Sequence, residues 1–223
     1  MNDSRARILG SIANSLGRGP LPPNATLELD RRLTAPRPNT VPARAQLPHP
    51  QQVDLFAQMA KAALATVEKL GTDQEIPAAV ARYLESEGLL PKVTYGPAPE
   101  LAALPWSGQA GLQATEGRVR DEGEAMVTGV FAAIAETGTL MITSGADTPT
   151  GNVFLPETHV AVVRAEQVVG PLEDAWTKLR AATGAAMPRT VNLVTGPSRT
   201  GDIEAVMYMG AHGPRRLHIL LIG

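Results

Sequence analysis

The sequence contains no cysteine. This absence excludes disulfides, thiolate nucleophiles, zinc sites built on cysteine and iron–sulfur clusters held by this chain. A chain without cysteine also suits a reducing compartment such as the cytoplasm. We therefore expect a cytoplasmic protein that binds no cofactor of its own.

Aromatic residues, excess charge and long apolar runs are also scarce. Phe, Trp and Tyr make up 4% of the chain, and the formal net charge is −2. Such a composition offers no base-stacking platform and no general attraction to phosphate backbones or anionic lipid. No apolar run approaches the roughly 18 residues of a membrane span, and no signal-peptide core follows the first charges. We expect no nucleic-acid partner and no membrane partner.

Several signature motifs are missing as well. The chain has no Gly-x-Gly-x-x-Gly turn, no Walker A lysine loop and no Gly-x-Ser-x-Gly nucleophile elbow. It also lacks the closely spaced histidine pairs that place metal ligands on one helix face. These absences disfavour nicotinamide or ATP binding, serine hydrolase chemistry and a metal site.

Prolines are concentrated in residues 1–50. The spacing of Ile8, Leu9, Ile12 and Leu16 predicts a short amphipathic helix over about 4–17. A Pro-rich extended arm is expected to follow, up to about residue 50. This arm is either a mobile tail or a segment that wraps a neighbouring subunit, and the sequence leaves both open.

From residue 51 onward, strand and helix patterns alternate as in an α/β domain. The first half predicts a helix near 53–63, a helix over 77–87 and a strand over 92–95. Residues 65–70 are either a strand or a continuation of the first helix, and Gly71 at their end favours the strand. In the second half, the segments 132–137 and 139–144 flank Gly138 and form either a hairpin or one kinked strand. Further strands are predicted at 159–163, 190–194 and 217–222, with helices over 171–182 and from Asp202. We therefore predict one domain over 51–223, with a mostly parallel central sheet and flanking helices.

The loop after the strand 190–194 carries one candidate site. Glycines, hydroxyls and a guanidinium before a helix start would form an anion cradle for a small carboxylate or phosphate. In open α/β sheets, such loops at the carboxyl ends of strands bind ligands. The acidic residues at 202 and 204 could instead satisfy the helix end and pair with the arginine, which leaves a structural turn open. The candidate ligand-binding residues are Gly196, Ser198, Arg199, Thr200 and Asp202.

A second candidate site is the segment Glu136-Thr137-Gly138-Thr139. Glu136 lies in an otherwise apolar stretch, so its carboxylate is expected to be partly buried. Such a group is either hydrogen-bonded for structural reasons or tuned for acid–base or nucleophilic chemistry. We take Glu136 as a catalytic candidate, and Thr137, Gly138 and Thr139 as ligand-binding candidates.

Four further polar residues lie outside these two segments. His212 lies in a turn between glycines and joins the ligand-binding candidates. His159 begins an apolar strand, where a lone histidine is more often structural than a ligand. Asp147 and Asn152 lie in a polar loop after a strand, which is either a solvated connector or part of a site.

Four motifs occur in one order along the chain: A-E-T-G-T-L, L-P-x-x-H-V, G-P-S-R-T-x-D-I-E and H-G-P. Together they resemble the LUD domain of the LutC/YkgG proteins, over about residues 51–223 and most strongly from Val127. The resemblance implies a fold related to the NagB, RpiA and CoA-transferase enzymes. It also implies a part in oxidation of L-lactate to pyruvate, beside iron–sulfur partner proteins of the A and B types.

The resemblance leaves three functional hypotheses open. The chain is an accessory or substrate-handling component of lactate oxidation, in which Arg199 would bind a carboxylate and Glu136 would act as acid or base. Alternatively, it is a non-catalytic assembly subunit that docks through its arm. The third reading is a stand-alone enzyme resembling the CoA transferases or sugar-phosphate isomerases, with Glu136 as nucleophile, and it rests on fold analogy alone.

Overall fold

The computed structural model describes residues 2–119, 123–184, 186–203 and 206–223 of the chain. The chain divides into two compact units, Met1–Thr40 and Val41–Gly223. Within the described residues, no helix combines the length and the apolar character that a membrane crossing requires.

The first unit contains two helices, α1 (Asn2–Ser15) and α2 (Pro23–Thr34). The first agrees with the predicted amphipathic helix, but the prediction of an extended arm was wrong over Pro23–Thr34. Proline suits the first position of a helix, since its missing N–H is not needed there. The residues that follow Pro23 include good helix formers, so the proline pair starts a helix and does not exclude one.

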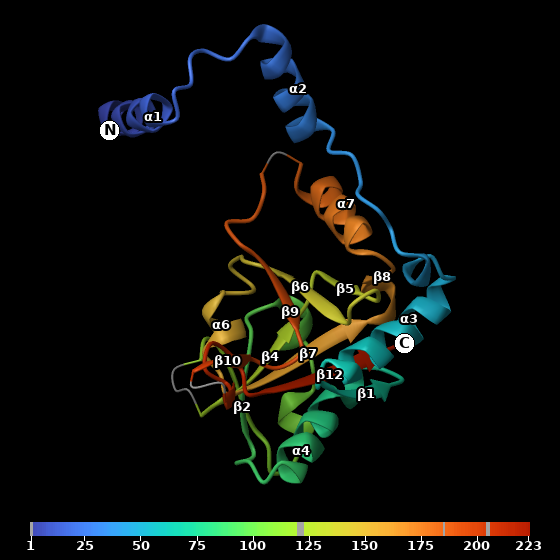
Figure 1. Ribbon diagram of the computed structural model, residues 1–223. Coiled ribbons are helices and arrows are strands. Elements are labelled where there is room, and N and C mark those ends of the chain that lie inside the picture. The colour runs from blue at the N-terminus through green and yellow to red at the C-terminus, as the bar shows by residue number, and fades with distance from the viewer. Residues whose placement is uncertain (1, 120–122, 185, 204–205) are drawn as a thin grey trace. The chain divides into compact units, whose positions relative to one another are not determined.

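The second unit is built around a six-stranded parallel sheet, which confirms the predicted fold class (Figure 1). Two of its interior strands, β7 (Thr158–Arg164) and β12 (Arg216–Ile222), are almost wholly buried and mostly apolar, as is typical of a strand covered on both faces. The strand order across the sheet is β1 (Thr66–Leu70), β12 (Arg216–Ile222), β7 (Thr158–Arg164), β4 (Ala125–Gly129), β2 (Lys92–Tyr95) and β3 (Gln113–Glu116).

One face of this sheet packs against α4 (Ile76–Ser86) and α5 (Pro99–Ala102). The helix α4 presents a nearly continuous apolar side, including Ile76, Val80 and Leu84, to the sheet. Gly88 follows the helix with a positive φ of 65°, as is typical of a glycine that ends a helix.

The other face is covered by α3 (His49–Ala62) and by a second sheet. That sheet has the order β8 (Val168–Val169), β5 (Ala132–Ile134), β6 (Thr139–Thr143) and β9 (Val191–Thr195). Its far side packs against α7 (Leu172–Thr183). The segments flanking Gly138 therefore form a hairpin, one of the two arrangements that the sequence left open. The remaining short elements are α6 (Gly151–Phe154) and the 3-10 turns η1 (Ala43–Ala45), η2 (Asp73–Glu75), η3 (Trp106–Gly108) and η4 (Ala165–Gln167).

The helix predicted from Asp202 is absent, and the chain forms a hairpin at that point. Its strands are β10 (Arg199–Ile203) and β11 (Val206–Met209), paired antiparallel with Thr200 opposite Tyr208. The β-branched and aromatic residues of these two segments are Thr200, Ile203, Val206 and Tyr208, and such residues favour strands over helices. The prediction gave too much weight to the acidic residues as a helix-start signal and too little to this composition.

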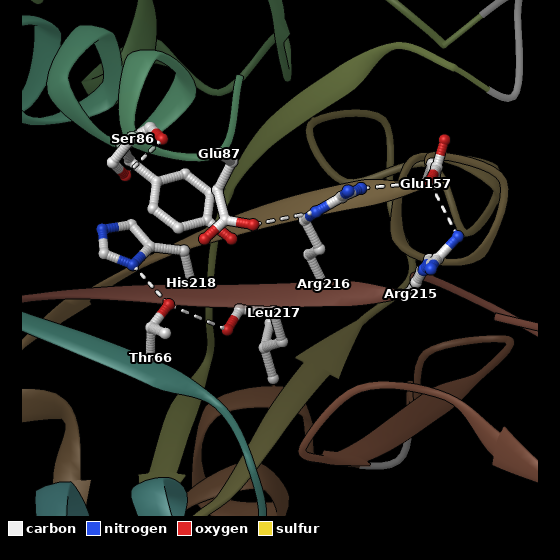
Figure 2. A network of polar contacts seen from close by, with 9 residues as sticks. Thr66, Ser86, Glu87, Glu157, Arg215, Arg216, Leu217 and His218 are labelled. Atoms are coloured by element: carbon white, nitrogen blue, oxygen red, sulfur yellow. Dashed lines mark hydrogen bonds and ion pairs between the residues drawn. The ribbon is translucent and has the colours of Figure 1, made fainter. Parts of the chain in front are cut away.

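A polar network holds the start of β12 (Figure 2). Arg216 Nε lies 3.1 Å from Glu87 Oε2, just beyond α4, and its Nη1 lies 3.0 Å from Glu157 Oε1. Its backbone N–H also donates to the Glu157 carbonyl. The network lies two residues after Pro214, at the end of the segment that carries His212.

His218, the histidine of β12, is buried on the α4 side of the sheet. Its ring stacks on Tyr83 with 3.9 Å between ring centroids. Its Nδ1 lies 2.8 Å from the Thr66 hydroxyl (Figure 2). Desolvation lowers the pKa of His218 to about 4, against a smaller opposing effect of the Glu68 carboxylate. The ring is therefore neutral in the folded protein near pH 7.

Gly138 provides a test of the packing between the hairpin and α3. A Cβ at this residue would lie 2.3 Å from the backbone nitrogen of Ala60. We expect Gly138→Ala to destabilise the protein by more than about 3 kcal/mol, because backbone must move. Gly88→Ala is the matched control, with nearly the same φ and open space around its Cβ. It should cost only about 1 kcal/mol. Equal losses for the two variants in urea unfolding would contradict this packing.

His218 provides a test of pH dependence. The unfolded chain takes up a proton on this ring near pH 6.5, and the folded chain only near pH 4. The unfolded state therefore binds more protons between these values, and stability falls as the pH drops through this window. Between pH 7.5 and 5, His218→Phe should lose about 2 kcal/mol less than the wild type. The control is His49→Gln at an exposed position, which should follow the wild type. Parallel wild-type and His218→Phe curves in urea unfolding would refute this assignment.

Candidate functional site

A cavity of about 320 Å³ lies between the second sheet and the parallel sheet. The end of β9 and the loop that follows it form one wall, and the turn around His212 forms another. The side chains of α6 and the first residues of β7 and β12 complete it. Its lining residues are Val153, Phe154, His159, Leu193, Val194, Thr195, Gly196, Pro197, Ser198, Arg199, His212, Gly213, Pro214 and Leu217.

The loop over the cavity takes its shape from Gly196. This residue has a positive φ of 67°, and a Cβ there would lie 2.0 Å from the carbonyl oxygen of Ala63. Only glycine fits such a close approach of two backbones. The turn therefore rests directly on the residue that follows α3.

Ser198 joins this loop to the turn around His212. Its backbone N–H donates to the Pro214 carbonyl at 2.8 Å, and its own carbonyl accepts the Gly210 N–H at 2.9 Å. Its hydroxyl oxygen accepts the His212 N–H at 3.2 Å. These bonds hold two segments of the cavity wall together.

Four of the predicted ligand-binding residues line this cavity, namely Gly196, Ser198, Arg199 and His212. Arg199 and His212 are exposed and lie at its mouth. Thr200 is buried within the hairpin and does not line the cavity. The side chain of Asp202 and all of Glu204 lie outside the described part of the chain, so their predicted pairing with Arg199 stays a prediction.

The position of the cavity differs from the expected one. The sequence suggested a site at the carboxyl ends of the parallel strands. His159 and Leu217 instead lie at the amino ends of β7 and β12, and the loop follows β9, which belongs to the second sheet. The helix-terminus cradle is also wrong, because the segment after Arg199 is a strand.

The most buried polar group of the cavity, His159, was not among the selected site residues. Its side chain is fully buried, and its Nε2 lies 2.7 Å from the Thr128 hydroxyl. Its Nδ1 has no hydrogen-bond partner among the described residues. Desolvation lowers the pKa of His159 to about 4, so the ring is neutral near pH 7. In the sequence, His159 is a histidine at the start of an apolar strand. This local pattern does not indicate that the 196–199 loop packs near it.

The Glu136 segment forms a separate cluster. The Glu136 carboxylate accepts the Leu172 N–H at 3.2 Å, at the first residue of α7, where a negative charge stabilises a helix. The hydroxyls of Thr137, Thr139 and Thr195 form a chain with 2.7 Å between successive oxygens. Of these residues, only Thr195 lines the cavity. The predicted roles of Glu136, Thr137, Gly138 and Thr139 stay predictions.

Of the polar residues that follow β6, Asn152 forms hydrogen bonds within the protein. Asn152 is buried, accepts the Val119 N–H and donates to the Gly117 carbonyl, both at 3.1 Å. Among the residues that the structure describes, no group of three His, Asp or Glu side chains lies where it could hold a metal ion.

Comparisons with known proteins agree with the resemblance that the four motifs suggest. Residues 118–222 match the family model described as LUD domain. Lactate utilization protein C of Deinococcus radiodurans is 36% identical over 104 residues, 46% of this chain and 48% of that protein. The uncharacterized protein YkgG of Escherichia coli is 27% identical over 99% of this chain and 98% of its own length. Lactate utilization protein C of Bacillus subtilis is 33% identical over 40% of this chain and 38% of that protein.

The alignments with the two proteins named for lactate utilization thus span about half of those proteins or less. A crystal structure of a DUF162 family protein from Deinococcus radiodurans has a similar fold, with a TM-score of 0.61. It is 22% identical to this chain and covers 79% of it and 99% of its own length. Residues 118–222 thus match the LUD domain, and the chain is similar to proteins of the LutC/YkgG type.

Proposed function

We propose that this protein is a substrate-handling component of L-lactate utilisation that works beside iron–sulfur proteins of the A and B types. The names of its relatives support the pathway. The observation that carries the substrate-handling role is the cavity with Arg199 at its mouth and hydroxyl groups beside it. A guanidinium with neighbouring hydroxyls is well suited to bind a carboxylate.

The charge of the described cavity lining fits an anionic ligand. Arg199 is its single charged side chain other than histidine, and no carboxylate is part of the lining. Ser198 already accepts a hydrogen bond from His212 N–H, so its hydroxyl hydrogen is free to be donated to a ligand oxygen. A small acid would thus meet one cation and at least one neutral donor.

Oxidation of L-lactate requires an acceptor for two electrons, and this chain has no cysteine to bind an iron–sulfur cluster. A division of labour follows, in which this subunit holds the small acid and the partners carry the electrons. The proposal does not depend on Glu136, whose carboxylate accepts the Leu172 N–H and which does not line the cavity.

An assembly role is the second candidate. A second cavity of about 530 Å³ adjoins the first and shares Phe154, His212 and Gly213 with it. Its wall includes the exposed apolar side chains of Leu155 and Met209. Exposed apolar residues around one hollow are typical of a surface that contacts another protein. This candidate predicts partner binding without any small ligand.

Thermal unfolding tests the substrate-handling role. L-lactate or pyruvate at a hundredfold excess over its dissociation constant should stabilise the protein by about 2.7 kcal/mol. For a chain of this size, that corresponds to a rise in Tm of roughly 5–10 °C. Arg199→Ala should abolish the rise. Arg189→Ala is the matched control, because it removes the same charge from an exposed residue that does not line the cavity.

Growth and co-purification provide the complementary measurement. In a strain that lacks its own C-type protein, the wild-type chain should restore growth on L-lactate, and Arg199→Ala should not. Both forms should co-purify with the A-type and B-type proteins. Full restoration of growth by Arg199→Ala, with no Tm rise for either acid, would refute substrate handling and favour the assembly role.

A further inference from the structure

His159 combines three properties that rarely occur together without a ligand. Its side chain is fully buried, the residue is one of those that line the cavity, and its Nδ1 has no partner among the described residues. A buried polar atom without a hydrogen bond costs about 1–3 kcal/mol, so such atoms are rare in folded proteins. A ligand atom that bonds to Nδ1 would remove this cost.

The contact with Thr128 determines which of the two ring nitrogens of His159 carries the hydrogen. The Thr128 hydroxyl is buried, and His159 Nε2 is its one hydrogen-bond partner among the described residues. If the hydroxyl donates to Nε2, the ring hydrogen is on Nδ1, and the Nδ1–H is the one group left without a partner. If Nε2–H donates instead, both the hydroxyl hydrogen and the Nδ1 lone pair are unpaired. The first arrangement leaves fewer buried groups unsatisfied and is therefore favoured.

We propose that His159 is a specificity-determining residue that donates a hydrogen bond from Nδ1 to an oxygen on the second carbon of a small carboxylic acid. The inference rests on the proposed carboxylate site and adds the chemical class that it prefers. Arg199 binds the carboxylate at the exposed mouth of the cavity. His159 donates a hydrogen bond to the oxygen on the neighbouring carbon at the buried end. Thr128 acts as a positioning residue, since it places the hydrogen on Nδ1.

The proposal predicts an order of affinity among acids of the same length. The carbonyl oxygen of a 2-oxo acid only accepts hydrogen bonds and matches an N–H donor directly. The oxygen of a 2-hydroxy acid also accepts, but its own hydrogen then requires a further partner. An acid without an oxygen at this carbon leaves Nδ1 unpaired, and a site built for a hydrogen bond discriminates against such a ligand.

Calorimetric titration of the wild-type protein with pyruvate, L-lactate and propionate at pH 7 is the first test. These acids share three carbons and a carboxylate and differ at the second carbon. We expect pyruvate to bind most tightly and propionate at least about tenfold more weakly. Equal affinities for pyruvate and propionate would overturn the inference while leaving the carboxylate site intact. Failure of all three acids to bind would overturn both proposals.

Two substitutions of His159 provide a matched pair. The amide nitrogen of Asn lies as many bonds from Cα as Nδ1, and that of Gln lies as many bonds from Cα as Nε2. His159→Asn should therefore keep the preference for pyruvate over propionate, and His159→Gln should lose it. Circular dichroism verifies that both variants are folded. The same preference ratio in His159→Gln as in the wild type would overturn the inference.

The tautomer can be measured directly, without any substitution. Nitrogen-15 NMR of the histidine rings should show His159 with its hydrogen on Nδ1, and this resonance should shift when pyruvate is added. Thr128→Val removes the hydroxyl with little change in shape and should reduce the preference for pyruvate over propionate. A ring with its hydrogen on Nε2 in the wild-type protein would contradict the assignment.

Discussion

Close contact between the second sheet and α3 is the constraint on which the cavity depends. A Cβ at Gly138, in the turn between β5 and β6, would lie 2.3 Å from the Ala60 backbone nitrogen. A Cβ at Gly196, just after β9, would lie 2.0 Å from the Ala63 carbonyl oxygen. Two turns of one sheet therefore rest on the end of one helix. This contact fixes the height of the 196–199 loop above the parallel sheet, and with it the space in which a ligand can lie.

The polar groups of the cavity come from both layers. The loop supplies the exposed Arg199 and the half-buried Ser198, and the parallel sheet supplies the fully buried His159. An apolar residue at position 159 would pack with less cost, because desolvation works against a polar ring at this depth. A histidine that stays neutral there can orient a ligand oxygen without adding a second buried charge.

Most of the fold was predictable because apolar periodicity reports which face of an element is covered. It gave the strand 92–95, the helix α4 and the last strand β12 nearly residue for residue. The hairpin after Arg199 and the helix α2 were missed, since local signals there are ambiguous. Glu136 was expected to be partly buried, as it is, but its partner on α7 lies 36 residues away. Such pairings follow from tertiary packing, which one sequence does not reveal.

The site was harder to predict than the fold for the same reason. Its walls come from segments near residues 153–159, 193–199 and 212–217, which meet only when the two sheets pack. The loop residues could be selected because an arginine among glycines and hydroxyls is a local signal. His159 could not, since its importance lies in an atom left without a partner. A ligand that bridges Arg199 and His159 would contact both layers, so its binding should stabilise their packing against each other as well as fill the cavity.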